Sequence, residues 1–189
     1  MAETRTVRQV TDQLQGFVDR VQQPQLGLPT PCTEWDVRAL LNHVTGGGII
    51  FAACIRDGAC PDDLLAAVMT EDQVGDDPSA SFRAAASAVL SAAEEADGET
   101  VVTTPWGEMP VSIVLDIATA DLSIHTIDLA LATGADLDGF DPELLATADE
   151  LAHRYFPAEG RGTNFAAPVE VAADSDPALR LAAYAGRTV

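Results

Sequence analysis

The sequence predicts a mainly α-helical protein: one helical bundle with short β elements and a small C-terminal extension. Three observations support this prediction. Alanine dominates the apolar fraction of 47% and aromatic residues make up only 5%, which favours helices over sheets. Apolar residues recur at spacings of three and four along several segments, as in a helix with one buried face. Proline stands at or near the start of several of these segments, where a helix tolerates it.

The length of 189 residues suits a single domain with a sizeable core. No internal repeat or low-complexity linker divides the chain. We therefore expect residues 1–156 to form a metal-binding helical bundle and residues 157–189 to form a C-terminal extension packed on the same domain.

The first two helices are predicted from apolar periodicity and from the residues at their ends. The first covers about residues 5–22 and ends before Pro24. The second covers about residues 34–56, with Thr33 as its N-cap and Asp36 as a short variant of the capping-box acid. The intervening segment is expected to be a loop.

The other two bundle helices are predicted over residues 79–96 and 111–133, and Gly134 ends the last one as a C′ glycine. Residues 101–104 are short and β-prone, and a turn follows them. Smaller elements are expected as helices near residues 64–69, 142–155 and 177–185 and as a brief strand at residues 169–171.

Charge and hydropathy exclude two classes of partner. The formal net charge is −20, and all ten basic residues are arginine. Because phosphate binding needs clustered basic side chains, we expect neither nucleic acid nor anionic membranes as partners. The most apolar stretch, residues 46–55, is much shorter than the roughly 20 residues that span a bilayer. Residues 1–5 do not resemble the start of a signal peptide, so we expect a cytoplasmic location.

The three cysteines, Cys32, Cys54 and Cys60, are odd in number and form no C-x-x-C motif. They therefore predict neither a disulfide framework nor a thiolate zinc site. We interpret them as small, buried apolar side chains.

The helix predicted over residues 111–133 has an unusual polar face. Asp121, His125 and Asp128 stand at i, i+4 and i+7, so they share the face that should be apolar. Burying charge costs several kcal/mol unless it is paired or binds a metal. This face is therefore either a satisfied hydrogen-bond cluster or a metal site.

A metal site needs a further ligand, and the second helix supplies His43. A catalytic Zn²⁺ site typically has three protein ligands and one exchangeable position. Asp121, His125 and His43 meet that requirement, with Asp128 as an alternative carboxylate ligand or as a hydrogen-bond partner behind the ligands. The third histidine, His153, is interpreted as a surface or helix-end residue.

Three consecutive glycines, Gly46, Gly47 and Gly48, lie one turn after His43. Each costs a helix about 1 kcal/mol against alanine. They serve close helix packing or a break in the helix, or else they clear space beside His43, and the sequence does not decide among these roles.

Paired motifs resemble a known family. Residues 29–37 (PTPCTEWDV) and 40–44 (LLNHV) are similar to the N-terminal signature of mycothiol-dependent maleylpyruvate isomerase-like proteins, within the DinB/YfiT-like superfamily. Residues 125–134 resemble the second signature of that family. Residues 104–107 and the closing Gly186-Arg187 fit its actinobacterial metal-binding branch.

The resemblance implies a DinB/YfiT-like four-helix bundle with short β elements, and a metal held by His43, Asp121 and His125. Asp121 departs from the family pattern, because the superfamily has a histidine there and the isomerase a glutamate. Because the side chain of Asp121 is shorter than a glutamate, Asp128 remains an alternative ligand.

The leading functional hypothesis is a divalent-metal-binding protein that acts as a thiol-dependent transferase or isomerase of the mycothiol type. Zn²⁺, or alternatively Ni²⁺, would bind the thiol of mycothiol, with a small-molecule thiol or electrophile as partner. Candidate pocket walls are Trp35, Gly47 and Trp106, although the tryptophans also suit a bundle core. A dicarboxylate substrate needs arginine clamps that the sequence does not place.

Two other classes remain open. A metal-dependent hydrolase would need a general base, for which Asp128 and Glu34 are the candidates. A non-catalytic metal-binding module would need no such group. A homodimer is also left open.

Overall fold

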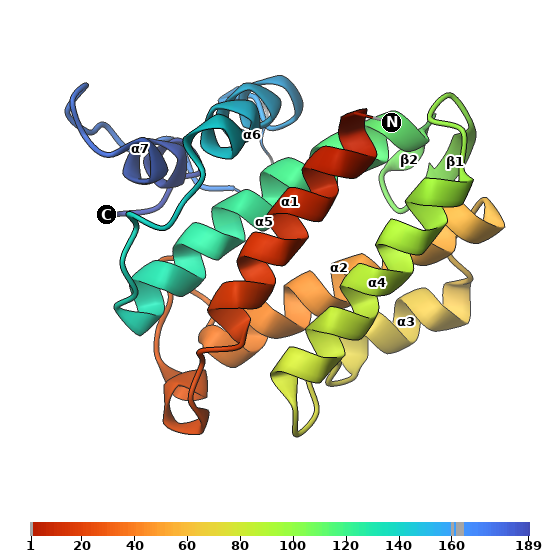
Figure 1. Ribbon diagram of the computed structural model, residues 1–189, viewed down its shortest axis with the longest axis horizontal. Helices are drawn as coiled ribbons and strands as arrows, with labels where there is room; N and C mark the ends of the chain where they lie inside the picture. The colour runs from red at the N-terminus through yellow and green to blue at the C-terminus, as the bar shows by residue number, and fades with distance from the viewer. Residues whose placement is uncertain (1, 160, 162–164) are drawn as a thin grey trace.

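The computed structural model describes residues 2–159, 161 and 165–189. Its long helices are α1 (Ala2–Val18), α2 (Val37–Asp57), α4 (Pro78–Glu95) and α5 (Val111–Thr133). Helix α1 lies beside α5, and α2 packs against α4 (Figure 1). The predicted four-helix bundle is confirmed, and α3 (Asp62–Thr70) is a short helix against α2.

Two smaller parts complete the fold. Strands β1 (Val101–Thr104) and β2 (Gly107–Pro110) form an antiparallel hairpin in which Val102 pairs with Met109. Helix α6 (Pro142–Tyr155) packs on α5, and α7 (Pro177–Tyr184) packs on both α6 and α5 (Figure 1). The division into residues 1–156 and 157–189 stays a prediction.

Aspartate–proline pairs fix the starts of three helices. The side chains of Asp77, Asp141 and Asp176 accept backbone N–H groups at the starts of α4, α6 and α7, and a proline follows each of them. Gly134 has a φ of +69° and ends α5 in the left-handed conformation that an L side chain disfavours. These local signals agree with the sequence prediction.

The ends of the first two bundle helices differ from the prediction. Helix α1 ends at Val18, and a 3₁₀ helix over Gln23–Gly27 occupies the expected loop, because Pro24 suits the first turn of such a helix. The N-cap of α2 is Asp36, whose side chain accepts the Ala39 N–H at 2.8 Å. The prediction of Thr33 as N-cap was wrong, because residues 29–36 fold back as a loop before the helix begins.

The strand predicted at residues 169–171 was also wrong. These residues belong to no helix or strand, and Val169 N–H donates to Ala183 O at 2.9 Å. Within the described residues 165–189 there is no neighbouring strand, so this apolar stretch packs against the end of α7 instead of joining a sheet.

The bundle interior consists of two apolar clusters that meet along α5. One cluster surrounds the second half of α5 and the start of α2, and the other surrounds the first half of α5 and the end of α2. Leu122 contacts both clusters. The polar face of α5 therefore lies in the middle of the bundle, where an unpaired charge would be costly.

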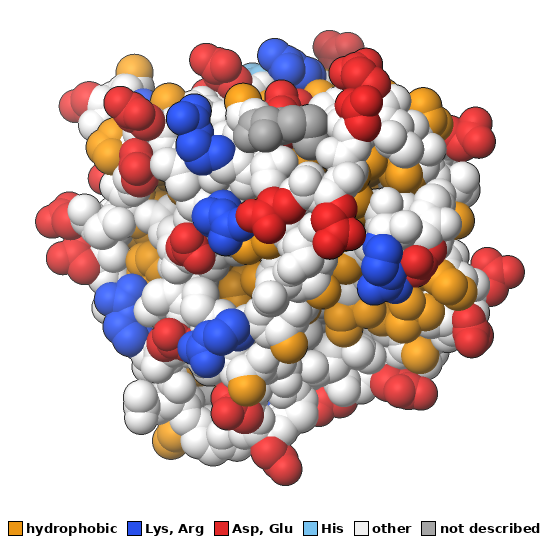
Figure 2. Space-filling view, turned by 45° about the vertical axis from the view of Figure 1, so that its right-hand side comes forward, with side chains coloured by type: hydrophobic (Ala, Val, Ile, Leu, Met, Phe, Trp, Pro, Cys, Tyr) orange, Lys and Arg blue, Asp and Glu red, His pale blue; other side chains and the backbone are white. Residues whose placement is uncertain are grey.

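Among the described helices, α2 alone has the length and apolar character of a membrane span, and 61% of that stretch is buried inside the bundle. Such burial is what a core helix shows. The outer surface is strongly acidic, and Figure 2 shows carboxylates spread over this face with separate arginines among them.

Candidate metal centre

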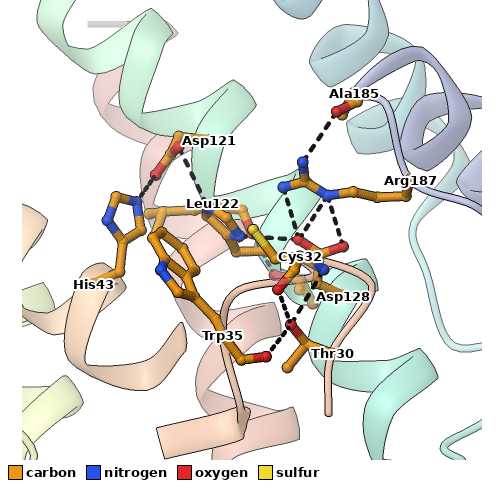
Figure 3. A network of polar contacts seen from close by, with 11 residues as sticks. Thr30, Cys32, Trp35, His43, Asp121, Leu122, Asp128, Ala185 and Arg187 are labelled. Carbon is orange, nitrogen blue, oxygen red and sulfur yellow. Dashed lines mark hydrogen bonds and ion pairs between the residues drawn. The ribbon is translucent and has the colours of Figure 1, made fainter. Parts of the chain in front are cut away.

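Helices α2 and α5 bring His43, Asp121 and His125 together, as the sequence predicts. One ligand atom from each residue lies within 4.8 Å of the other two. Asp121 lies between the imidazoles: its Oδ2 is 3.5 Å from His43 Nε2, and its Oδ1 is 3.5 Å from His125 Nε2 (Figure 3). The i, i+4 spacing on α5 places Asp121 and His125 one turn apart on the same face.

The two separations from Asp121 fit a metal ion. A distance of 3.5 Å is long for an N–H···O hydrogen bond, which is usually about 2.9 Å. It is close to the roughly 3.4 Å between ligand atoms in a tetrahedral site with bonds of about 2.1 Å. Two imidazoles and one carboxylate are also a donor set that Zn²⁺ accepts. His43 is the exposed member of the cluster and His125 the buried one, so the site opens to solvent on the His43 side.

The electrostatics of the cluster favour charged side chains despite burial. Burial raises the pKa of Asp121, but the neighbouring His125 and His43 outweigh it and hold that pKa well below its usual range. Burial lowers the pKa of His125, but Asp121 and Asp128 outweigh it and raise the pKa to about 9. A proton on His125 therefore balances the carboxylates, and a bound cation would have to displace it.

Asp128 lies behind His125, away from the other two residues of the cluster. Its Oδ2 is 3.0 Å from His125 Nδ1, so with the proton on Nδ1 the imidazole donates to the carboxylate and its Nε2 faces Asp121. Asp128 is completely buried. A buried carboxylate on the second nitrogen fixes the ring orientation of a metal-binding histidine.

Arg187, near the C-terminus, neutralises Asp128. Its Nε lies 3.1 and 3.2 Å from the two carboxylate oxygens, and its Nη2 lies 3.0 Å from Oδ2. Arg187 is only 5% exposed, and its Nη1 donates to Ala185 O at 3.0 Å. Burial raises the pKa of Asp128, but His125 and Arg187 outweigh it and lower that pKa.

Arg187 was not among the predicted site residues, although the closing Gly186-Arg187 pair belonged to the family resemblance. The sequence signal for a special backbone turn before Arg187 is Gly186, whose φ is +85°. A Cβ on this residue would lie 2.7 Å from Ala166 O, so only glycine permits this close approach. The turn at Gly186 directs the next side chain back toward α5.

The loop before α2 covers one side of the cluster. The Trp35 ring centroid lies 4.7 Å from that of His43 and 5.6 Å from that of His125. Thr30 holds the loop, because its hydroxyl donates to Trp35 O at 2.9 Å and accepts the Cys32 N–H at 3.1 Å. Figure 3 shows Cys32 on the same loop beside the Asp128–Arg187 pair. Burial raises the pKa of the Cys32 thiol.

Helix α2 continues through its three glycines without a break, and they divide between the other two roles considered for them. A Cβ on Gly46 would lie 2.7 Å from Val68 Cγ1, and one on Gly48 would lie 3.1 Å from Ala85 Cβ. These two glycines therefore permit close helix packing. A Cβ on Gly47 would meet nothing within 4 Å, and Gly47 lines a cavity together with Asp121.

Trp106 is not brought to the cluster. It lies at the turn of the β1–β2 hairpin, is 60% exposed and has its ring 5.9 Å from that of Phe51. Its role as a wall of the pocket stays a prediction. His153 is exposed near the end of α6 and stacks on Tyr184, and Glu34 is exposed on the loop before α2.

The fold and the cluster together define a class of protein: a four-helix bundle with an inward-facing His–Asp–His centre. Residues 7–130 match the family model described as the mycothiol maleylpyruvate isomerase N-terminal domain. The chain belongs to this family, as the resemblance in its motifs predicted.

Relatives and solved structures agree with the family assignment. Two uncharacterized proteins from Mycobacterium tuberculosis, strains CDC 1551 and H37Rv, are 36% identical over 188 residues, covering 94% of this chain and 93% of each relative. The crystal structure of the mycothiol-dependent maleylpyruvate isomerase matches with a TM-score of 0.60 at 17% identity, and that of its histidine-to-alanine mutant with 0.61 at 16%. Each match covers 77% of this chain and 66% of the isomerase, so the chain spans just under two thirds of the isomerase's length.

Proposed function

We propose that this protein is a metal-dependent transferase or isomerase that uses a low-molecular-weight thiol of the mycothiol type. The observation that carries the proposal is the convergence of His43, Asp121 and His125 within 4.8 Å in a family named for a mycothiol enzyme. Zn²⁺ is the expected metal, with Ni²⁺ as the alternative, and mycothiol is the expected cosubstrate.

The chain's own residues would have separate tasks in this reaction. His43, Asp121 and His125 would hold the metal, and a bound Zn²⁺ would lower the pKa of a coordinated thiol so that thiolate is available at neutral pH. With its proton on Nδ1, His125 would donate a hydrogen bond to Asp128, which keeps Nε2 directed at the site. Trp35 would shield the imidazoles on the loop side, and the exposed His43 side would admit the thiol.

The contacts of Asp128 disfavour it as the general base of a hydrolase. A hydrolase needs a free general base within reach of the metal-bound water. Asp128 is buried and already bound by both His125 and Arg187, so it is not free for that role. Glu34, the other candidate, is exposed on the loop before α2. A non-catalytic metal-binding module remains an outcome of the experiment below.

The expected partners and location follow from the surface charge and the cysteines. The acidic surface supports a small-molecule thiol or electrophile as partner and disfavours nucleic acid and anionic membranes. Three free cysteines and a thiol cosubstrate suit the reducing cytoplasm, which is the location we propose. A homodimer is compatible with this function but is not required by it.

The test uses the Co²⁺-substituted protein. Millimolar mycothiol should produce a sulfur-to-metal charge-transfer band, whereas S-methylated mycothiol should not. A His125→Ala variant serves as the control, because it should lose both the bound metal and the band. Full metal content without a thiol-dependent band would contradict the transferase function. The non-catalytic metal-binding module would then be the favoured function.

A further inference from the structure

A cavity of about 20 Å³ lies between α1, α2, α4 and α5 and reaches Asp121. We call it the apolar slot. Gly47 and Phe51 line it from α2, Phe82 and Ala86 from α4, and Ala118 and Leu122 from α5. The volume exceeds the 10–15 Å³ that one water needs, so the slot has room for a methyl or ethyl group. Asp121 is the residue that the slot shares with the candidate metal centre, and Gly47 lies one helical turn after His43.

The walls of the apolar slot suit an uncharged hydrocarbon group better than water or an anion. Apart from Asp121, its only polar side chain is Thr11, whose hydroxyl already donates to Arg8 O at 2.8 Å. None of the lining residues that the structure describes is basic. A carboxylate in the slot would lose its hydration without a partner and would face the negative charge of Asp121.

The one arginine in the candidate metal centre is not available to bind a substrate carboxylate. Asp128 holds the Arg187 guanidinium through Nε and Nη2, and Ala185 O accepts from Nη1. The side chain is 5% exposed. A substrate with one or two carboxylates would therefore find no free cation beside the metal ligands within the described part of the chain.

Resting on the function proposed above, we propose that the second substrate is a small neutral electrophile whose apolar end enters the apolar slot. Gly47 is the specificity-determining residue, because a side chain at this position would fill the slot. A terminal epoxide with a short alkyl group is a representative member of this class.

The reaction with such an epoxide balances without a further reagent. The thiol releases its proton to water when it becomes thiolate. The thiolate sulfur then attacks the terminal carbon, an S–C bond forms and the C–O bond breaks. The electron pair goes to the oxygen, which takes a proton from water, so the product is a hydroxyalkyl thioether.

The first test needs neither metal nor turnover. Crystals of the purified protein under xenon pressure should show one xenon atom bordered by Gly47, Phe51 and Phe82, because apolar cavities of sufficient size bind xenon. Gly47→Leu should abolish this site. Gly16→Leu is the matched control, since Gly16 is an exposed helical glycine of α1 whose added Cβ also meets nothing within 4 Å. Absence of xenon from the wild-type protein would overturn the proposal.

The second test compares two epoxides with the same three-carbon skeleton, 1,2-epoxypropane and 2,3-epoxypropanoate, with mycothiol as the thiol. The acceleration over the uncatalysed reaction should be at least about tenfold greater for the neutral epoxide, because the carboxylate has no partner in the slot. Gly47→Leu should remove at least about tenfold of the acceleration for 1,2-epoxypropane, with metal content and the Co²⁺–thiol band unchanged. Gly16→Leu should match the wild type in all three measurements.

The outcomes separate the two proposals. An intact Co²⁺–thiol band with equal or greater acceleration of 2,3-epoxypropanoate would overturn the substrate class and leave the thiol function standing. Loss of activity in Gly47→Leu for both epoxides equally, with xenon still bound in the wild type, would show that the slot is a packing defect. A missing band in the wild type would overturn the thiol function, and the substrate class with it.

Discussion

Replacing Arg187 with methionine should destabilise the protein more than any other exchange of an arginine on the C-terminal segment. The substitution keeps much of the side-chain volume but removes all three contacts of 3.0 to 3.2 Å to Asp128. Asp128 is fully buried, and His125 would be its one remaining partner with a charge. Removing one member of a buried ion pair costs about 3–5 kcal/mol, because the other charge stays buried without compensation.

The assay is urea unfolding followed by far-UV circular dichroism. Arg187→Met should lower the free energy of unfolding by about 3–5 kcal/mol. Arg180→Met on α7 is the matched control, because Arg180 is exposed and such substitutions usually change stability by less than about 0.5 kcal/mol. The double variant Arg187→Met/Asp128→Asn should be less destabilised than the sum of its single variants, by about 0.5–3 kcal/mol, because the amide removes the uncompensated charge. If Arg187→Met unfolds at the same urea concentration as the control, the proposed role of the ion pair is wrong.

The other predictions concern the metal ligands, the glycines of α2 and the loop tryptophan. Purified protein should contain about one Zn²⁺ or Ni²⁺ per chain by elemental analysis, and His125→Ala should lose it; full stoichiometry in that variant would contradict the ligand assignment. Asp128→Asn should weaken metal binding by roughly 10–100-fold in a chelator competition, and an unchanged affinity would argue against its positioning of His125. Gly46→Ala should destabilise the bundle in urea, because its Cβ would lie 2.7 Å from Val68, whereas Gly47→Ala should stabilise it by about 1 kcal/mol; the reverse order would contradict the packing described here. Metal addition should change the fluorescence of wild-type protein but not of Trp35→Phe, because Trp106 lies apart from the cluster at the hairpin turn.

The parts of the fold that the sequence predicted well are those with strong local signals. Proline after Asp77, Asp141 and Asp176 marks three helix starts, and Gly134 marks the end of α5. The error at Thr33 has a different origin. That residue has the chemistry of an N-cap, but long-range contacts of Thr30 fold the preceding segment into a loop, so the helix begins only after Asp36.

The candidate metal centre could be predicted in part because two of its ligands lie on one helix. The spacing of Asp121 and His125 indicates a shared face, and the family resemblance points to His43 on another helix. Arg187 could not be assigned in this way. It lies 59 residues after Asp128, and its role depends on a close approach at Gly186 that no periodic pattern reports.

The formal charge of the centre connects the metal ligands with the proposed thiol. Without a metal, a protonated His125 and Arg187 balance Asp121 and Asp128, which agrees with the raised pKa of His125. A divalent ion would displace that proton and leave both imidazoles neutral, as metal ligands must be. The two carboxylates, Arg187 and the ion then sum to +1, and one thiolate restores neutrality. A dicarboxylate would instead add two further negative charges at a site whose one arginine is already paired, which is a physical reason for a thiolate and a neutral electrophile to react here.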